Sequence, residues 1–460
     1  MNAETRDEPK HSDPGALHSE VVPALEGALK ADDRVAVHGL LQPLHAAEIA
    51  DLLESVSPES REYLVEVLRD DFDPKILAEL DDAVAERVVE LLGIPHVATV
   101  VASLATDDAV DIVEDLDEKL QQAILQPLPE RRRALVEEAL SYPVDSAGRL
   151  MRRRVVAVPE HWSVGRVIDF LRDADDLPAD FFDVFLIDAD RRPLGAIPLS
   201  RVIRADRDVA LAEIKRADLC LIPVEMDQEE VAFLFSQRDL ISAPVVDADG
   251  VLLGVITIDD IVDVIHEEHE ENIMGLAGVG GENFLFHAIL DTTKSRFLWL
   301  VVHLIAAIAA SAVISLFAGT IEELVALAIL MPIVATMGGT AGVQALTVAV
   351  QAIAMKELTV SNALRAIRKE LIVSLLNGLM FAVLIGGVAW VWFESPALGG
   401  VIALAMVINL IAAGLAGSAL PIILDRAGFD PAVASSALLI SITDVVGFYV
   451  FLSLAAVLLL

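Results

Sequence analysis

A single carboxylate stands inside the last apolar segment of the chain. Residues 431–460 exceed the roughly 20 apolar residues that a membrane span needs, and Asp444 lies 13 residues past Pro431. At about 1.5 Å per residue, this places Asp444 about 20 Å along a helix, near the middle of a bilayer. A carboxylate at this depth is expected to avoid lipid and to face a bundle interior or a water-filled path. Asp444 therefore predicts an ion or proton pathway, with a helix-packing hydrogen bond to Thr443 or Ser441 as the structural alternative.

The segment MPIVATMGGTAGVQALT places helix-weakening residues inside another apolar stretch. These residues are Pro332, Gly338, Gly339 and Gly342. They predict a break in the span, where unwound backbone lines a cavity, or else close packing of helices through small residues. Carbonyl groups of unwound backbone near Gly338–Thr340 would accept hydrogen bonds from the water around a cation. The candidate ion pathway consists of Gly339, Thr340, Thr443 and Asp444.

Acidic side chains crowd the stretch DDIVDVIHEEHEENIMGLAGVGGEN. They stand at positions 259, 260, 263, 267, 268, 270 and 271 of an expected helix. Like charges at this density repel one another unless counter-ions lie between them, so the stretch predicts cation binding. An ordinary solvated helix is the alternative. His266 and His269 are three residues apart, whereas the zinc-protease signature H-E-x-x-H needs four, so this chemistry is not expected.

The net charge of −37 is divided unevenly along the 460 residues. Residues 297–460 hold five basic and eight acidic side chains, so nearly all the negative charge lies before them. This charge argues against nucleic acid as a partner and favours cations, although general solubility would also explain it. Cys220 is the only cysteine, which excludes a disulfide within the chain and suits a cytosolic soluble half.

Five apolar segments are long enough to span a membrane. They cover residues 297–319, 324–353, 371–393, 399–424 and 431–460. Basic side chains precede the first span and lie between the second and third and between the fourth and fifth; the other two loops hold only acidic ones. The positive-inside rule then predicts a cytoplasmic N-terminus and an external C-terminus.

The soluble half divides by its hydrophobic pattern. Residues 1–20 are polar and predicted to be a disordered tail. Residues 21–140 hold loose amphipathic repeats, among them AAEIADLLESV, AVAERVVELL and DAVDIVEDL, which predict a small solenoid of stacked helices.

From residue 141 the pattern alternates strands and helices in two copies. The second copy contains LISAPVVDADGVLLGVITIDDI, a hairpin with an Asp-Gly turn. The tandem arrangement resembles a pair of CBS domains, at 141–207 and 208–265. In that family the motif formed here by Gly254, Thr257 and Asp260 often holds an adenosine nucleotide, so Thr257 and Asp260 are candidate ATP ligands. The first copy has Pro198 and Arg201 at these places, which argues against nucleotide binding there.

The order of these parts resembles the MgtE family of magnesium transporters, over about residues 25–460. The motifs that carry the resemblance are VVDADGVLLGVITIDDIVDVI with GLAGV, GGTAGVQ, and GFDPAVAS…TDVVG. The resemblance implies a multidomain membrane protein: an α-helical solenoid, tandem α/β CBS domains, a connecting plug helix over 266–296 and a five-helix transmembrane α domain over 297–460. It also implies a homodimeric Mg²⁺ channel in a prokaryotic cell membrane.

The resemblance implies roles for individual acidic residues. Asp444 matches the pore carboxylate that binds the hydrated ion, and Asp430 an acid at the cytosolic mouth of the pore. The residues that match acidic sensor positions for cytosolic Mg²⁺ are Asp107, Asp239, Asp260, Asp263, Glu268 and Glu271. Some positions depart from the family pattern: Thr340 and Val343 replace asparagines, Ala437 replaces a proline, and Asn272 replaces an acid.

We therefore expect a non-enzymatic Mg²⁺ channel that imports magnesium and closes when cytosolic Mg²⁺ binds the acidic sensor. A cation exchanger with Asp444 as a protonatable site, an intramembrane protease and a membrane-anchored nucleotide sensor are the alternatives. The protease reading lacks a nucleophile set in the spans, and the polar, glycine-rich spans argue against a plain anchor.

Overall fold

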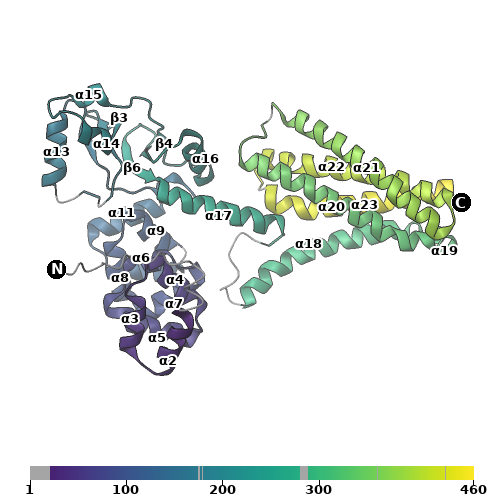
Figure 1. Ribbon diagram of the computed structural model, residues 1–460, viewed down its shortest axis with the longest axis horizontal. Helices are drawn as coiled ribbons and strands as arrows, with labels where there is room; N and C mark the ends of the chain where they lie inside the picture. The colour runs from purple at the N-terminus through teal and green to yellow at the C-terminus, as the bar shows by residue number, and fades with distance from the viewer. Residues whose placement is uncertain are drawn as a thin grey trace, which may run out of the picture. The chain divides into compact units, whose positions relative to one another are not determined.

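The computed structural model describes residues 21–114, 116–174, 177–178, 180–279, 289–359, 361–429 and 431–460 (Figure 1). The predicted disordered tail at 1–20 lies outside the described residues. The chain forms two compact units, Met1–Ile265 and His266–Leu460, and each is described by itself.

Short amphipathic helices build the first part of unit one. Side chains cap several of them: Asp33 and Ser57 accept from backbone N–H groups at N-caps, and His45 and Glu48 form a capping box. The α-helices bury apolar side chains, such as Leu52 and Leu53 of α4, and neighbouring helices pack against one another, which confirms the predicted solenoid. The helices are α2 (Val22–Lys30), α3 (Arg34–Leu41), α4 (Ala46–Ser55), α5 (Pro58–Leu68), η2 (Arg69–Asp71), α6 (Pro74–Ala78), α7 (Asp82–Leu92), α8 (Ile94–Ser103), α9 (Thr106–Glu114), α10 (Glu118–Leu125) and α11 (Glu130–Leu140). The short α12 (Ala147–Leu150) follows and packs into the core of the second CBS copy.

Two copies of one α/β unit follow, as the CBS pattern predicts. In each copy the first strand pairs parallel with the second, and the second pairs antiparallel with the third. The first copy contains β1 (Ala157–Pro159), α13 (Val164–Asp173), β2 (Asp183–Ile187), β3 (Pro193–Pro198), α14 (Leu199–Arg204) and α15 (Leu211–Ile214). The second contains β4 (Ile222–Pro223), α16 (Gln228–Arg238), β5 (Ser242–Val246), β6 (Leu252–Thr257) and the start of α17 (Ile258–Leu276).

In each copy, a segment that contains an arginine forms a single β-bridge to the last strand, at the equivalent residue of that strand. Arg216 bridges to Ala196 on β3, and Arg152 bridges to Val255 on β6. A glycine permits each crossing: a Cβ at Gly195 would lie 2.9 Å from the Arg216 carbonyl oxygen, and one at Gly254 would lie 2.8 Å from that of Arg152. Arg216 and Arg152 therefore occupy equivalent positions in the two copies.

The helix that carries the acidic run is confirmed, but its bounds differ from the predicted 266–296. α17 begins at Ile258, directly after β6, and ends at Leu276. Residues 280–288 lie outside the described residues, and residues 289–296 form the start of α18 (Ile289–Ser315). The acidic run thus continues the last helix of the second CBS copy, because no turn residue interrupts it.

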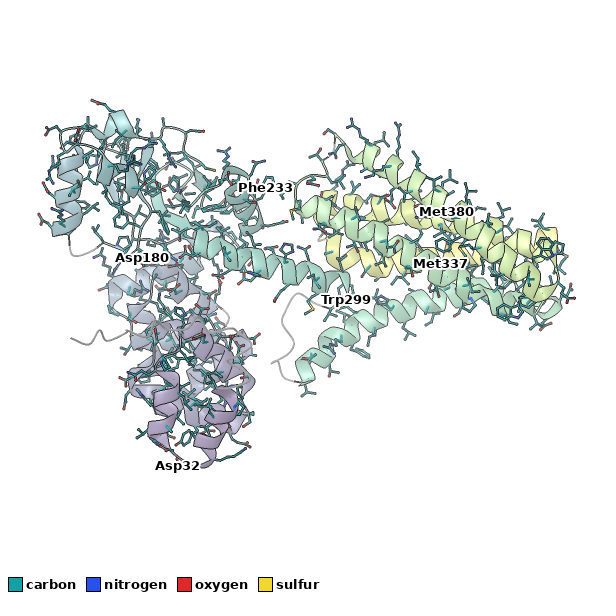
Figure 2. All side chains as sticks on the ribbon, viewed as in Figure 1. Asp32, Asp180, Phe233, Trp299, Met337 and Met380 are labelled. Atoms are coloured by element: carbon teal, nitrogen blue, oxygen red, sulfur yellow. The ribbon has the colours of Figure 1, made fainter. Side chains whose placement is uncertain are left out.

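In the described part of unit two, five helices are long and apolar enough to span a membrane, which agrees with the predicted number of spans. They are α18, α20 (Ala326–Ala354), α21 (Ala363–Phe393), α22 (Pro396–Arg426) and α23 (Pro431–Leu458), with the short α19 (Ala318–Glu323) after the first. α22 packs against α20, α21 and α23 and is the most buried of them. Large apolar side chains such as Met380 on α21 remain exposed, as lipid contact requires (Figure 2).

The predicted break in the second span is wrong, because α20 is helical throughout, with Pro332 inside it. The glycines instead allow close packing. A Cβ at Gly417 of α22 would lie 2.5 Å from the Gly342 carbonyl oxygen, and a Cβ at Gly338 would overlap the Asn409 amide. Close packing of helices through small residues, the alternative to a break in the span, therefore explains these glycines.

A pair of alanine variants tests this packing. Gly417→Ala is expected to destabilise the membrane unit by about 1–3 kcal/mol, because the backbone oxygen in the way cannot rotate aside. Gly400→Ala on the same helix meets nothing within 4 Å and is expected to be neutral. Thermal unfolding of the detergent-solubilised protein compares them, and equal melting temperatures would contradict the account.

Candidate cation pathway and acidic sensor

Asp444 lies near the middle of α23, where it was predicted, and is half-buried. Its neighbour Thr443 and Gly447, one turn further on, lie on the buried face of the helix. Among the described residues, no hydrogen bond or ion pair to the Asp444 carboxylate is found. The carboxylate thus lies at the edge of the packed surface, available to a ligand or to a second chain.

Asn409 of α22 is the polar residue of this region whose role the sequence did not reveal. Its side chain is fully buried between Gly338 of α20 and Gly447 of α23. Nδ2 donates to the Val334 carbonyl oxygen at 2.9 Å, whereas Oδ1 accepts no hydrogen bond from the described residues. A buried, unsatisfied amide oxygen close to the turn that holds Asp444 is a potential acceptor for the water around a cation.

Among the described residues, the other predicted pathway residues make no hydrogen bond to the Asp444 carboxylate. Thr443 is buried and its hydroxyl donates to the Ile440 carbonyl oxygen at 3.0 Å, within its own helix. Thr340 is exposed and donates to Thr336 of α20 at 2.9 Å, and Gly339 faces open space. Their roles in conduction stay predictions. Asp430 lies outside the described residues.

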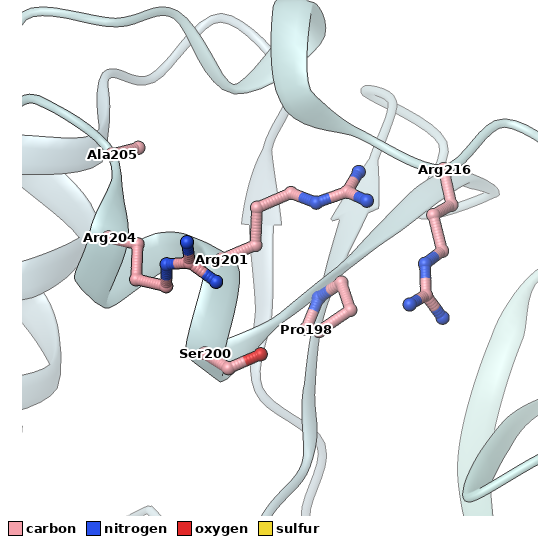
Figure 3. A pocket seen from close by; sticks show the side chains of 6 residues that line it. All are labelled: Pro198, Ser200, Arg201, Arg204, Ala205 and Arg216. Carbon is pink, nitrogen blue, oxygen red and sulfur yellow. The ribbon is translucent and has the colours of Figure 1, made fainter.

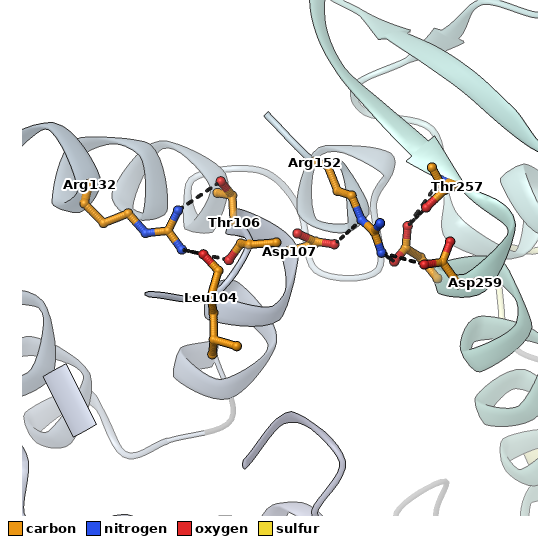
Figure 4. A network of polar contacts seen from close by, with 9 residues as sticks. Leu104, Thr106, Asp107, Arg132, Arg152, Thr257 and Asp259 are labelled. Carbon is orange, nitrogen blue, oxygen red and sulfur yellow. Dashed lines mark hydrogen bonds and ion pairs between the residues drawn. The ribbon is translucent and has the colours of Figure 1, made fainter. Parts of the chain in front are cut away.

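In unit one, the Arg152 guanidinium holds together three carboxylates (Figure 4). Nε donates to Asp107 of α9 at 2.8 Å, and Nη2 donates to Asp259 at 2.8 Å and to Asp260 at 2.7 Å. The Arg152 side chain is 24% exposed. One cation therefore joins the helical solenoid to the first turn of α17.

Asp107 is the most deeply buried acid of this network. It lies in the first turn of α9, and Arg132 of α11 fixes the preceding loop by donating to the carbonyl oxygens of Leu104 and Ala105 at 2.6 and 2.8 Å. Burial raises the pKa of Asp107 to about 7, helped by the charges of Asp108 and Asp260 and opposed by Arg152. Its Oδ1 atom has no partner among the described residues. The network thus leaves one oxygen of a buried carboxyl group without a hydrogen-bond donor from the described residues.

Asp260 is bound on both oxygens. Oδ1 accepts from Arg152, and Oδ2 accepts from the Thr257 hydroxyl at 2.8 Å and from its backbone N–H at 3.2 Å. Burial raises the pKa of the Asp260 carboxyl, and Arg152 opposes that rise. Thr257 and Asp260 are thus engaged within the protein, and their role in nucleotide binding stays a prediction.

A second group of acidic side chains contains residues of both the solenoid and α17. Burial raises the pKa of Glu79, and the nearby Asp263 and Asp108 charges raise it further, against His45 and Lys75. Asp263 was predicted as a sensor residue, whereas Glu79 and Asp108 were not. Because these carboxylates repel across the junction of two elements, a cation between them would stabilise that junction.

The remaining predicted sensor residues lie elsewhere. Asp239 is the C-cap of α16, in the left-handed conformation at φ 51°, and is exposed. Glu268 and Glu271 lie on the part of α17 that belongs to unit two, where Asn272 donates to the Glu268 carbonyl oxygen at 2.7 Å. Within the described ranges, no group of three or more His, Cys, Asp or Glu side chains is preformed to hold a metal.

The acidic sites contain residues that the sequence analysis did not single out, and the sequence gives only weak signals for them. Arg152 begins the run RRR at 152–154, where the residue facing the acids cannot be distinguished from its neighbours. Asp108 and Asp259 are the sequence neighbours of the predicted sensor residues Asp107 and Asp260, so their closeness to the site could have been predicted. Nothing in the local sequence distinguishes Glu79 from other surface acids.

The fold and these acidic groups define a multi-span membrane protein with a CBS pair and a charged helical domain. Residues 44–145 match the MgtE intracellular N domain, residues 147–208 and 211–267 match the CBS domain, and residues 331–454 match a family described as a divalent cation transporter. The chain belongs to the MgtE family of magnesium transporters.

Two relatives and one solved structure show the extent of the similarity. The magnesium transporter MgtE of Thermus thermophilus is 30% identical over 448 residues, which cover 96% of this chain and 99% of that protein. The magnesium transporter MgtE of Enterococcus faecalis is 32% identical over 321 residues, covering 70% and 71%. The crystal structure of the cytosolic domain of the Mg²⁺ channel MgtE in complex with ATP is 30% identical, covers 53% of this chain and 99% of that one, and has a TM-score of 0.49.

Removal of Arg152 tests its counter-charge role. Arg152→Gln in Mg²⁺-free buffer is expected to destabilise unit one by about 3 kcal/mol, because the buried Asp107 and the largely buried Asp260 lose the cation that they share with the exposed Asp259. Thermal unfolding of the full-length protein measures this, and millimolar Mg²⁺ should recover part of the loss. The control Arg34→Gln breaks the exposed Arg34–Glu66 pair and should change little. Equal behaviour of the two variants would refute the assignment.

Proposed function

We propose that the protein is a homodimeric Mg²⁺ channel that imports magnesium and closes when cytosolic Mg²⁺ binds its acidic sensor. The observation that carries the proposal is the half-buried Asp444 carboxylate in the middle of the last of five spans. The proposal keeps the predicted division of the chain into an N domain 21–140, CBS domains 141–207 and 208–265 and a transmembrane domain 297–460, with α17 in place of the predicted connecting helix 266–296.

The chemistry of Mg²⁺ suits a pore with few protein ligands. The ion holds its water tightly and prefers an octahedral oxygen shell, so a pore selects it best in hydrated form. The Asp444 carboxylate supplies negative charge, and the unsatisfied Asn409 Oδ1 is a further hydrogen-bond acceptor within the bundle. A single chain brings one carboxylate to this depth; a second copy about a shared axis would add another and place two charges around the ion.

The proposed orientation follows the distribution of basic residues. Lys294 and Arg296 lie in the first turns of α18, before its apolar stretch, and Arg365, Arg368 and Lys369 lie at the start of α21. The positive-inside rule then places the solenoid and the CBS pair in the cytoplasm, where they meet internal Mg²⁺.

The sensor residues fit hydrated Mg²⁺ better than a dehydrated ion. The described acids form no closed cage, but Mg²⁺ often binds through one or two carboxylates and keeps several waters. The repelling acids Glu79, Asp108 and Asp263 are such a set, beside the network that Arg152 already neutralises. Mg²⁺ is proposed to bind between the solenoid and α17, where Arg152 supplies one fixed positive charge.

Gating then follows from linkage. An ion that binds only the closed state at about ten times its Kd stabilises that state by about 1.4 kcal/mol. Three such ions contribute about 4 kcal/mol, enough to change the ratio of closed to open channels about a thousandfold. Several weak sites therefore give a steep response to millimolar Mg²⁺.

Conduction is tested with Asp444→Asn. We expect Mg²⁺ flux into proteoliposomes to fall at least about tenfold, because the amide keeps the size but removes the charge that attracts the ion. Asp444→Glu should retain part of the flux. Glu394→Gln, at the end of α21, is the matched control and should conduct normally. Normal flux through Asp444→Asn would exclude Asp444 from the ion pathway.

Gating is tested with the double variant Glu268→Gln, Glu271→Gln. We expect the channel to stay open at Mg²⁺ concentrations that close the parent, with half-closure shifted at least about tenfold, because α17 loses two charges that bind the closing ions. Flux is measured against cytosolic-side Mg²⁺. The control Glu59→Gln, Glu62→Gln removes two exposed charges from α5. If the double variant closes as readily as the control, the sensor assignment is wrong.

A further inference from the structure

The exposed side of α21 begins with three basic residues, Arg365, Arg368 and Lys369. All three side chains are exposed, and their spacing of three and four residues places them on one face of the helix. The same face continues along α21 with exposed apolar side chains, at Ile372, Leu376, Leu379, Met380 and Val383. A group of positive charges is therefore followed directly by a row of apolar side chains.

The opposite side of α21 packs against α22. Ser374 and Gly378 are buried on this side, and a Cβ at Gly378 would lie 3.1 Å from the Val407 Cα of α22. One turn before Ser374, the Glu370 carbonyl oxygen would lie 3.7 Å from a Cβ at Gly414 of α22. The acid that follows the three basic residues in the sequence therefore belongs to the packed side of the helix.

No ion pair to Arg365, Arg368 or Lys369 is found in the part of the chain that the structure describes. The positive-inside rule accounts for basic residues near this end of a span, but residues of the preceding loop would satisfy it equally well. Here the charges lie on the face that continues into the lipid-facing row, where long basic side chains extend to the level of lipid headgroups. A second copy of this chain is an unsuitable partner for the face, because a two-fold axis through it would bring like charges together.

We propose that this face of α21 binds an anionic phospholipid, with the headgroup phosphate held by Arg365, Arg368 and Lys369 and the acyl chains along the apolar row. Guanidinium groups donate paired hydrogen bonds to phosphate oxygens, and the lysine adds a point charge. A zwitterionic lipid also has a phosphate, but its own ammonium group offsets that charge. The site therefore prefers lipids with a net negative charge. The proposal goes beyond the transport function and does not depend on it.

The test is native mass spectrometry of the full-length, detergent-solubilised protein with equal amounts of phosphatidylglycerol and phosphatidylcholine of matched acyl chains. The buffer is freed of Mg²⁺ beforehand, since the metal would itself bind the anionic lipid. We expect phosphatidylglycerol adducts to exceed phosphatidylcholine adducts at least about tenfold, because each basic residue near a membrane surface favours anionic lipid about fivefold. The triple variant Arg365→Gln, Arg368→Gln, Lys369→Gln should lose this preference, and its exposed substitutions leave the packing of α21 on α22 unchanged.

The control removes three positive charges from unit one. Arg201, Arg204 and Arg216 line a cavity of about 440 Å³ in the first CBS copy (Figure 3). The variant Arg201→Gln, Arg204→Gln, Arg216→Gln changes the net charge as much as the α21 variant does, but it leaves the membrane helices intact. It should keep the preference of the parent for phosphatidylglycerol.

Four results would overturn the proposal. The parent could bind the two lipids equally, or the α21 variant could keep the full preference of the parent. The control could lose the preference as completely as the α21 variant, which would show a response to net charge alone. A parent without the preference, together with a changed oligomeric mass of the α21 variant, would instead assign this face to contact between copies. None of these results would bear on Mg²⁺ flux through Asp444.

Discussion

Carboxylates that leave bulk water need a counter-charge or a hydrogen bond, and this chain removes several of them from water. In unit one Arg152 joins Asp107, Asp259 and Asp260, and the pKa of Asp107 rises to about 7 even beside that cation. In unit two Asp444 lies half-buried among apolar helices. In the proposed function, mobile cations satisfy both places, one as a regulatory site and the other as a conduction path.

The two CBS copies show how small changes redirect one scaffold. Both cross the last strand with an arginine beside a glycine, at Arg152 with Gly254 and at Arg216 with Gly195. Aspartates after β6 neutralise the first arginine and turn its site into an internal ion pair. The replacement of the equivalent acid by Arg201 leaves the other site positive. A single backbone arrangement thus supports an acidic network in one copy and a basic cavity in the other.

Much of the architecture was readable from local patterns. Five spans followed from apolar length, the CBS copies from strand–helix alternation with an Asp-Gly turn, and the acidic helix from its charge spacing. The Arg152 network could not be predicted from the sequence, because Arg152 binds Asp107 and Asp260, which are 45 and 108 positions away. Only the folded chain determines which arginine of the run at 152–154 reaches these acids. The break predicted in α20 failed for a related reason. Glycines permit either unwinding or close packing, and the Asn409 side chain on another helix decides between them.

In the proposed mechanism cations hold acidic elements together, so the most direct measurement is channel current in inside-out membrane patches while Mg²⁺ at the cytosolic face is varied. We expect current that falls steeply as Mg²⁺ enters the millimolar range. The same curve for Arg152→Gln should lie at higher Mg²⁺, since the closed assembly has lost its fixed cation. Current that is indifferent to cytosolic Mg²⁺, or identical curves for both proteins, would contradict the claim that counter-charge at the solenoid–α17 junction controls the pore.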